Sequence, residues 1–173
     1  MQSNQVLDDA FSRIAEEARG VVDGLDAEVL VWQPEPGSNS IAWLLWHLAR
    51  VQDDHVADLA DGEQLWVAES WAPRFGLSQD TTETGYGHTP DQVRAVRPED
   101  GEVLLGYLDA VTTRTRNLLA TVGDEDLDRV IDTSWDPPVT MGVRLMSVIG
   151  DGLQHVGQAA YLRGLHDRTA RPG

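Results

Sequence analysis

The sequence predicts an all-α fold, a bundle of four long helices with one long insertion. Two observations support it. Apolar residues recur at steps of three and four over residues 5–24, 40–61, 99–122 and 140–165. Segments rich in proline and glycine separate these stretches. The chain of 173 residues also has no cysteine, yet it is long enough to bury a core without disulfide or zinc staples. We therefore expect one domain over residues 1–166.

The first helix is expected over residues 5–24, where one face is apolar and the opposite face carries glutamates. Its inward stripe consists of Val6, Ala10, Ile14, Ala18 and Val21. Gly24 ends it. Residues 30–39 contain two prolines and a glycine, which stop both neighbouring helices, so we expect a connector there.

The second helix is expected to begin at a cap provided by Ser38, Asn39 or Ser40 and to end at Asp61-Gly62. No period persists from residue 63 to about 98, although the segment is rich in aromatic residues. Long irregular connections of this kind are often functional, so we expect a lid containing Trp66, Trp71 and Phe75. Thr89 followed by Pro90 predicts a short helix inside the segment.

The third helix is expected over residues 99–122 and the fourth over residues 140–165. Gly123 closes the third helix, and a second connector with two adjacent prolines leads to Thr140, which can cap the fourth. Residues 167–173 end in Arg-Pro-Gly and are predicted to form a flexible tail.

Composition excludes several classes of function. The net charge of −16 repels phosphate backbones and anionic lipid, and the arginines do not cluster, so neither nucleic acid nor a membrane surface is an expected partner. Every basic residue apart from histidine is arginine. Without lysine or cysteine the chain cannot form a Schiff base or provide a thiolate nucleophile. The N-terminus lacks the features of a signal peptide and no stretch is long enough to span a bilayer, so we expect a cytoplasmic protein.

A candidate site is indicated by Asp151 and His155, which lie four residues apart in the apolar fourth helix. This spacing stacks both side chains on one helix face. A carboxylate in such surroundings is costly unless it is paired or coordinates a cation. Two interpretations remain open at this point: the pair binds a metal, or Asp151 pairs with an arginine and His155 is a satisfied core histidine.

A metal site would need a third donor from another helix, because three protein ligands and an open position are typical of catalytic centres. His47 and His55 both lie on the second helix. Their separation of eight residues is about 12 Å of helix rise, so only one of them can be the third ligand. His88 and His166 are expected to be solvated.

Several short motifs, in this order, resemble the DinB/YfiT-like superfamily of metalloenzymes. They are Trp46–Val51 (WHLARV), Trp71–Leu77 (WAPRFGL), Thr84–Thr89 (TGYGHT), Asp151–Gln158 (DGLQHVGQ) and Tyr161–Gly164 (YLRG). Within the superfamily the chain is similar to the actinobacterial branch that includes mycothiol-dependent maleylpyruvate isomerase and mycothiol S-transferases. The resemblance covers nearly the whole chain.

The resemblance implies an up-down-down-up bundle with a long crossover after the second helix, and a divalent metal, zinc or nickel, held by His47, Asp151 and His155. Many relatives have histidine or glutamate in place of Asp151, which leaves the identity of the metal open. Two mechanisms fit: the metal binds a low-molecular-weight thiol such as mycothiol and activates it for transfer to a small-molecule substrate, or it activates water for hydrolysis with His55 as the base.

Three further expectations follow from this interpretation. Arg50, Arg74 and Arg97 are candidates to bind an anionic cosubstrate. A homodimer is expected, because bundle helices with wide apolar faces leave surface to cover and members of the family often pair. The competing interpretation is a bundle that has lost its metal and serves as a ligand-binding or structural module.

Overall fold

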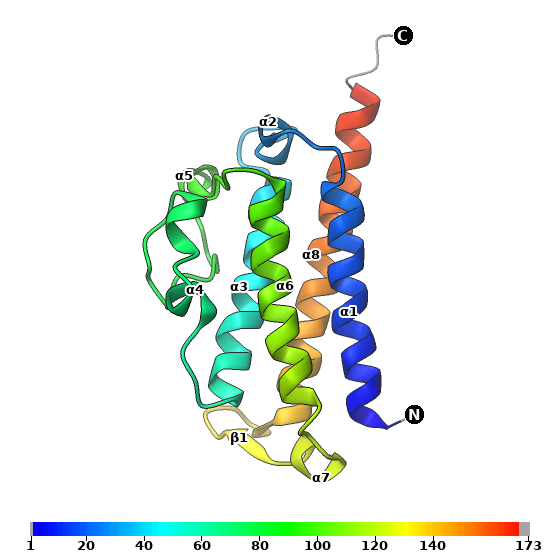
Figure 1. Cartoon of the computed structure of the whole chain (residues 1–173). Helices are drawn as coiled ribbons and strands as arrows, with labels where there is room; N and C mark the ends of the chain where they lie inside the picture. The colour runs from blue at the N-terminus through cyan, green and yellow to red at the C-terminus, as the bar shows by residue number, and fades with distance from the viewer. Residues whose placement is uncertain (1, 170–173) are drawn as a thin grey trace.

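In the computed structural model, which describes residues 2–169, four long helices form the bundle (Figure 1). They are α1 (Ser3–Val22), α3 (Ile41–Leu59), α6 (Gly101–Leu119) and α8 (Met141–Thr169). Helices α1 and α8 run upward in Figure 1, whereas α3 and α6 run downward. Each long helix packs on two others: α3 contacts α8 and α6, and α1 contacts α6 and α8. The all-α bundle predicted from the sequence is confirmed, and the directions are those that the resemblance implied.

The expected helix starts are set by side-chain caps. Of the three candidates for the start of α3, Ser40 is the cap, and its hydroxyl accepts a hydrogen bond from the Trp43 backbone N–H at 3.1 Å. Thr89 caps the short helix α5 (Pro90–Ala95), as predicted. Asp100 caps α6 by accepting from the Val103 N–H at 2.9 Å.

The end of α8 differs from the expectation. The helix continues to Thr169, three residues into the segment predicted to be a flexible tail. No proline or glycine interrupts residues 165–169, so the helical backbone continues to the edge of the described part. Residues 170–173 of the predicted tail lie outside the described residues.

The crossover between α3 and α6 is not irregular throughout. It contains α4 (Leu65–Ala68), the 3₁₀ helix η1 (Ala72–Phe75) and α5. Trp66 and Phe75 are almost completely buried, and their rings pack around Tyr107 of α6 at centroid distances of 5.4 and 5.9 Å. These aromatic side chains therefore extend the core over the flank of the bundle, and they do not form a lid over the residues predicted to bind metal.

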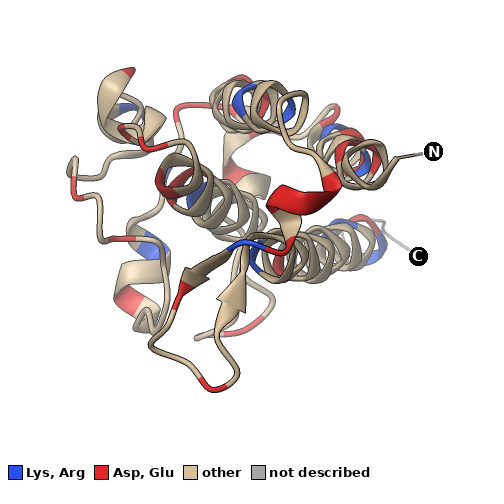
Figure 2. Cartoon of the chain, turned by 90° about the horizontal axis from the view of Figure 1, so that it is seen from below, with Lys and Arg blue, Asp and Glu red and all other residues tan. Residues whose placement is uncertain are grey.

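Short elements close the two ends of the bundle. At the upper end, α2 (Ala27–Leu30) connects α1 to α3. At the lower end lie the acidic helix α7 (Asp124–Leu127) and a hairpin of β1 (Val130–Asp132) and β2 (Val139–Thr140), seen from below in Figure 2. The two strands pair antiparallel with an irregular register between Val130 and Asp132.

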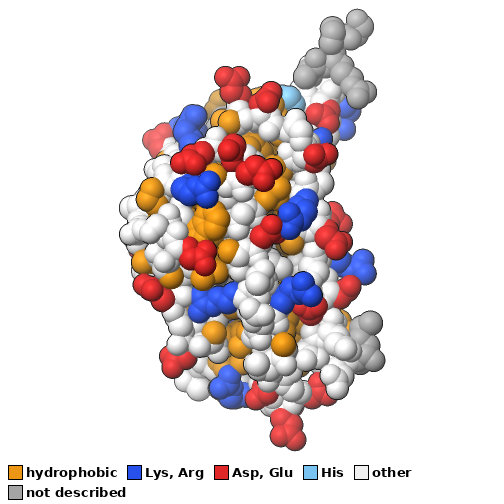
Figure 3. All heavy atoms as spheres, viewed as in Figure 1, with side chains coloured by type: hydrophobic (Ala, Val, Ile, Leu, Met, Phe, Trp, Pro, Cys, Tyr) orange, Lys and Arg blue, Asp and Glu red, His pale blue; other side chains and the backbone are white. Residues whose placement is uncertain are grey.

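Charges of both signs are dispersed over the face formed by α1, α6 and the crossover (Figure 3). Arginines of these segments pair with acids elsewhere in the chain, as Arg116 does with Asp8 at 2.8 Å and Arg74 with Glu99 at 3.4 Å. Among residues 2–169, no helix has the length and apolar content needed to cross a membrane.

Candidate metal centre

The packing of α3 against α8 brings three of the predicted residues together. His47 lies in the middle of α3, while Asp151 and His155 lie one turn apart on α8. One ligand atom from each side chain can be chosen so that all three lie within 4.8 Å of one another. The Nε2 atom of His47 is 3.8 Å from Oδ1 of Asp151, and Nδ1 of His155 is 3.6 Å from the same oxygen. We call these three residues the triad. His47, and not His55, is the histidine of α3 that joins it.

The orientation of His47 is fixed by the crossover. Its Nδ1 lies 2.5 Å from the backbone carbonyl oxygen of Thr84. A carbonyl oxygen only accepts hydrogen bonds, so Nδ1 carries the proton and Nε2 keeps a free lone pair on the side of Asp151. The indole of Trp43 stacks on the imidazole at 4.7 Å with an angle of 9° between the planes. Metal-binding histidines are usually held in this way by a second hydrogen bond.

On α8 the backbone provides the corresponding support. Nδ1 of His155 lies 2.8 Å from the carbonyl oxygen of Asp151, so this nitrogen is the donor and Nε2 is free to bind a metal. The Asp151 side chain is 29% exposed, yet its Oδ2 atom is buried and has no hydrogen-bond partner. A buried carboxylate oxygen without a donor is costly and uncommon, and a bound cation would satisfy it.

The electrostatic environment favours the form of His47 that binds metals. Burial lowers the pKa of His47, and this effect outweighs the hydrogen bond to Thr84 and the attraction of Asp151, which raise the pKa. The imidazole is therefore neutral at neutral pH. Two imidazoles and one carboxylate form a donor set that fits zinc or nickel and leaves coordination positions for other ligands.

A glycine lies against the triad where no other residue fits. Gly85 adopts a φ of +98°, and a Cβ atom at this position would lie 2.8 Å from Nδ1 of His47 and 2.9 Å from the Trp46 ring. This close approach puts the preceding Thr84 carbonyl within reach of the imidazole. Neither Thr84 nor Gly85 was a candidate site residue on sequence grounds, although the TGYGHT motif contains both.

His88 was expected to be solvated, and this was wrong. Its side chain is only 5% exposed. Its Nδ1 accepts a hydrogen bond from the Trp43 indole N–H at 3.0 Å, and its Nε2 donates to the Glu83 carboxylate at 2.7 Å. His88 thus fixes the ring that stacks on His47, and it connects residues 83–88 to α3.

His55, the predicted catalytic base, lies two turns from His47 and outside the triad. Its Nδ1 accepts from the Arg144 guanidinium at 3.2 Å, and both residues line a hollow of about 610 Å³ beside the hairpin. Burial lowers the pKa of His55, and the positive charge of Arg144 lowers it further. The base role of His55 stays a prediction.

Arg50 differs from the expectation that it binds an anionic cosubstrate. The residue is 0% exposed, so a cosubstrate has no access to its guanidinium. The guanidinium donates to the carbonyls of Thr81 and Glu83 at 3.1 Å each and to the side chains of Gln64 and Tyr107. Arg50 therefore ties the crossover to α3, the same segment that orients His47.

The two other predicted arginines lie at the surface of the crossover. Arg74 pairs with Glu99 and lies over the ring of Trp71, with its guanidinium carbon 5.4 Å from the ring centroid. Arg97 is exposed, and its backbone N–H donates to the Phe75 carbonyl at 3.0 Å. Their role in binding an anion stays a prediction.

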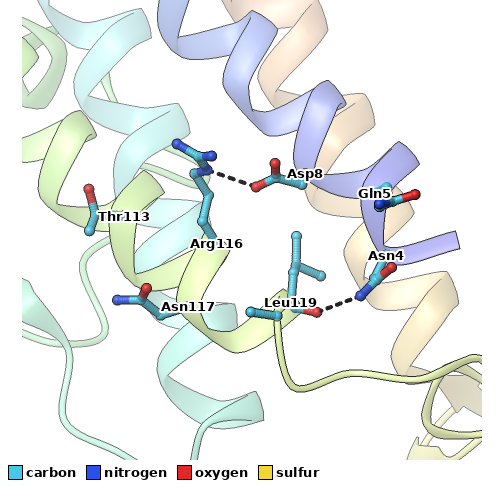
Figure 4. Close-up of a pocket in the computed structure, with 8 residues that line it drawn as sticks. Asn4, Gln5, Asp8, Thr113, Arg116, Asn117 and Leu119 are labelled. Carbon is cyan, nitrogen blue, oxygen red and sulfur yellow. Dashed lines mark hydrogen bonds and ion pairs between the residues drawn. The ribbon is translucent and has the colours of Figure 1, made fainter. Parts of the chain in front are cut away.

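A separate pocket of about 390 Å³ lies between the start of α1 and the end of α6 (Figure 4). Two interactions join polar groups that line it: Arg116 pairs with Asp8, and Asn4 donates to the Leu119 carbonyl at 3.1 Å. It contains none of the triad residues. The candidate functional centre is therefore the triad.

Comparison with known proteins identifies the family of this chain. The family model of the DinB superfamily matches residues 10–159, a range that includes all three triad residues. The chain belongs to the DinB superfamily. The match does not distinguish the actinobacterial mycothiol branch from the rest of the superfamily.

A solved structure of a conserved protein from Enterococcus faecalis is also similar, with 32% sequence identity and a TM-score of 0.87. The match covers 94% of this chain and 96% of the other, so the whole bundle is shared. No curated protein matches the chain.

Proposed function

We propose that the protein is a divalent-metal enzyme whose ion, zinc or nickel, is bound by His47, Asp151 and His155. The observation that carries this proposal is the buried, unpartnered Oδ2 atom of Asp151 within a cluster of three ligand atoms. Both imidazoles donate their Nδ1 protons to backbone carbonyls, so both Nε2 atoms are available as ligands.

The reaction that we propose is transfer of a low-molecular-weight thiol, such as mycothiol, to a small electrophilic substrate in the cytoplasm. A bound metal would keep such a thiol ionised near neutral pH. The chain has no cysteine, so the sulfur nucleophile must come from a cosubstrate. The choice of mycothiol, and the actinobacterial branch it implies, rests on the resemblance of the sequence motifs.

Protein side chains would prepare this site before any substrate binds. The Thr84 carbonyl holds the His47 ring in one tautomer, and Trp43 covers one face of that ring. Gly85 allows the crossover backbone to lie directly on the imidazole, which excludes water from that side. The exposed part of Asp151 and His155 is then the side from which a thiol would approach.

Hydrolysis is the second candidate reaction, because His55 is a neutral histidine on the same face of α3. However, its Nδ1 lone pair already accepts from Arg144, so the proton lies on Nε2 and neither nitrogen is free to take another. The thiol transfer needs no such base. We therefore place it first.

The first experiment is elemental analysis of untagged wild-type protein beside Asp151→Ala, His155→Ala and His55→Gln. We expect about one zinc or nickel ion per chain in wild type and in His55→Gln, and loss of at least ten-fold in the two triad variants. Equal metal content in all four proteins, or none in wild type together with no rise in melting temperature on added zinc or nickel, would contradict the metal centre and favour a bundle that serves as a ligand-binding or structural module.

The second experiment measures thiol transfer by the metal-loaded protein. Mycothiol, glutathione and cysteine are each supplied with a chromogenic aryl halide, and product formation is compared with that of Asp151→Ala. Transfer that requires both the metal and one thiol supports the proposal. A metal-loaded protein that transfers none of the thiols but hydrolyses a chromogenic ester would favour the second candidate.

A further inference from the structure

The seam between α3 and α8 contains a second pair of contacting polar residues below the triad. In the middle of the seam, His47 meets Asp151 and His155. Two turns lower, Nδ1 of His55 accepts a hydrogen bond from the Arg144 guanidinium at 3.2 Å. The two contacts join the same two helices, so the triad and this second pair lie along one seam.

The part of the seam between these two positions is apolar. Val51 of α3 lies four residues from each of the two histidines of that helix, so the three side chains follow one helix face. On α8, Val148 lies between Arg144 and Asp151 and is 3% exposed. The seven residues from Arg144 to Asp151 correspond to about 10 Å of helix rise. The seam therefore offers a candidate metal site and a cation about 10 Å apart, with valine side chains between them.

Arg144 lines a hollow that has room for a small molecule. The hollow has a volume of about 610 Å³, and small-molecule sites have about 300–1,000 Å³. Its walls come from the end of α3, the start of α8 and the hairpin of β1 and β2, which lies at the lower end of the bundle (Figure 2). We call this space the hairpin hollow.

The donor groups at the hairpin hollow are held in place but not saturated. The Arg144 guanidinium donates to His55 and, at 3.0 Å, to Oδ2 of Asp132. A guanidinium has more N–H groups than these two acceptors occupy, and the Arg144 side chain is 22% exposed. Its other N–H groups and the Nε2–H of His55 have no acceptor among residues 2–169. The protein thus fixes a cation with free donors before any ligand binds.

Acids also line the hairpin hollow, but they do not satisfy these donors. Asp58 and Asp61 are exposed near the end of α3, where water and salt screen their charge. Asp132 already accepts two hydrogen bonds from a serine of its own turn. On the hairpin side, Arg129 is exposed and forms no ion pair within the described part of the chain. A carboxylate is the group that matches a planar guanidinium with free N–H groups.

We propose that Arg144 binds the carboxylate of the electrophilic substrate, which lies along the seam with its reacting carbon at the triad. This inference rests on the proposed thiol transfer and names the class of acceptor, a small organic acid with its carboxylate and its electrophilic carbon at opposite ends. In the transfer the thiol loses its proton to solvent and its sulfur bonds to that carbon. The bond from the carbon to the leaving group breaks, and the leaving group takes the electron pair. Arg144 holds the substrate and exchanges no bond.

The charge of the chain makes this binding site selective. A net charge of −16 repels anions over most of the surface, so an acid gains affinity only where donors are fixed close to it. The arginines predicted to bind an anion do not lie on the seam: Arg50 is buried, and Arg74 and Arg97 lie at the surface of the crossover. Of these four arginines, Arg144 is the one that lines the hairpin hollow.

The first test measures binding to the whole chain after treatment with a chelator, so that no metal ion can hold the carboxylate. The probes are a chloronitrobenzoate and the matching chloronitrobenzamide, which have nearly the same shape and differ in charge. By titration calorimetry we expect wild type to bind the acid at least ten-fold more tightly than the amide. In Arg144→Gln this preference should be lost.

Two variants separate binding from a structural role of the ion pair. Arg116→Gln removes the same charge from an arginine that also pairs with an acid of another helix but lines a different pocket, so it should keep the preference for the acid. Asp132→Asn breaks the same contact to the hairpin and keeps Arg144, so it should bind the acid at least as tightly as wild type does. Equal binding of acid and amide by wild type would overturn the proposal. Loss of the preference in Arg116→Gln or in Asp132→Asn would overturn it as well.

The second test measures the spacing between the metal and Arg144 in the nickel-loaded chain. Mercaptopropionate, mercaptohexanoate and mercaptooctanoate join a thiol to a carboxylate through chains of increasing length, and the matching mercaptoalcohols lack the charge. Absorption from thiolate-to-nickel charge transfer reports the binding of the sulfur. The gain of acid over alcohol should be largest for the chain that spans about 10 Å and should vanish in Arg144→Gln. A gain that is absent, or equal at all lengths, would contradict the proposed position of the carboxylate.

The role of Arg144 and the proposed enzymatic activity can fail separately. A chain that binds metal and transfers thiols, but shows no preference for the acid, would remain an enzyme and would overturn the role of Arg144. A chain that prefers the acid through Arg144, but holds no metal when purified and takes up none, would contradict the metal enzyme and leave the carboxylate site in place.

Discussion

Helix α3 contributes to two buried polar clusters that lie one turn apart, and they differ in whether their buried oxygens have hydrogen-bond donors. The first is the triad, in which His47 meets Asp151 and His155 of α8. The second joins Arg50 and Asp53, both 0% exposed, to Tyr107 of α6. Both clusters remove charged or polar groups from water, which is costly for either one.

The two clusters differ in how their oxygens are satisfied. Asp53 accepts hydrogen bonds from the backbone N–H groups of Leu65 and Trp66 at 3.0 and 2.8 Å and from the Tyr107 hydroxyl at 2.8 Å. Asp151, in contrast, has a buried oxygen with no donor at all. A buried charged group therefore does not by itself indicate a functional site. A buried oxygen that lacks a hydrogen-bond donor does. The cluster around Asp53 is satisfied by the protein itself, whereas the triad has a buried acceptor that a bound cation would satisfy.

The largest effect is expected when the satisfied cluster loses its acid. Asp53→Ala leaves Arg50 buried without its counter-charge, so the free energy of unfolding should fall by about 3–5 kcal/mol. Chemical denaturation of the metal-free protein measures this change. Asp9→Ala, which removes the partner of Arg13 in an exposed pair on α1, should change stability far less. Equal losses in the two variants would mean that the buried pair contributes no more than a surface pair.

The next effect concerns the backbone that lies against the triad. In Gly85→Ala the new Cβ atom would overlap His47 and Trp46 and the residue would keep a φ of +98°, so we expect a loss of about 2–3 kcal/mol and weaker metal binding. Gly87→Ala provides the control, because Gly87 also has a positive φ, +73°, but its Cβ would meet nothing within 4 Å. Only the first variant should affect metal affinity, which titration calorimetry with zinc measures.

A smaller effect should appear as the pH is lowered. Burial lowers the pKa values of His47 and His55 in the folded chain below the ordinary value of 6.5. The unfolded chain then binds more protons than the folded chain just below pH 6.5. The contribution of these two histidines to the stability of the metal-free protein is therefore fully present above pH 6.5 and declines below it. The decline can reach about 1.4 kcal/mol per pH unit for each histidine and stops below the folded pKa. His55→Gln should remove the contribution of His55 to this pH dependence. Urea denaturation midpoints of wild type and variant, measured between pH 7.5 and 5.5, test this expectation.

The smallest change in stability is expected at the triad itself. Asp151→Ala removes a carboxylate whose Oδ2 is unpartnered, so the metal-free protein should unfold within about 1 kcal/mol of wild type. Saturating zinc should nevertheless raise the melting temperature of wild type and leave that of the variant unchanged. A large loss of stability in the metal-free variant would place Asp151 in the same structural role as Asp53.

The long helices could be predicted from the sequence because their signals are local. Period, caps and closing glycines lie within or beside each helix, and the predicted bounds differ from the observed ones by a few residues. The short helix α4 has no such signal. Its first N–H groups are bound by Asp53, twelve and thirteen residues earlier in the chain, so only the folded structure forms it. The hairpin of β1 and β2 was missed for a similar reason, since each strand has three residues or fewer.

The site could be predicted only in part. The four-residue spacing of Asp151 and His155 could be recognised in the sequence, and the family resemblance indicated His47 rather than His55 as the third ligand. The contact between Thr84 and His47 joins a backbone carbonyl to a side chain thirty-seven residues away. Every residue has a backbone carbonyl, so the identity of residue 84 does not indicate this contact. Arg50 was misjudged because arginine usually lies at the surface. The sequence does contain one sign that Arg50 is buried: Asp53 follows it by one turn of the same helix and can pair with it.

The long crossover and the late position of α8 determine when the proposed metal centre can form during synthesis. His47 leaves the ribosome before the crossover that orients it, and more than a hundred residues before its two partners on α8. Until that last helix is made, α1 and α3 also lack one of the helices on which each of them packs. A growing chain therefore holds only one of the three proposed ligands until α8 has been made, and the proposed site can bind a metal only after that.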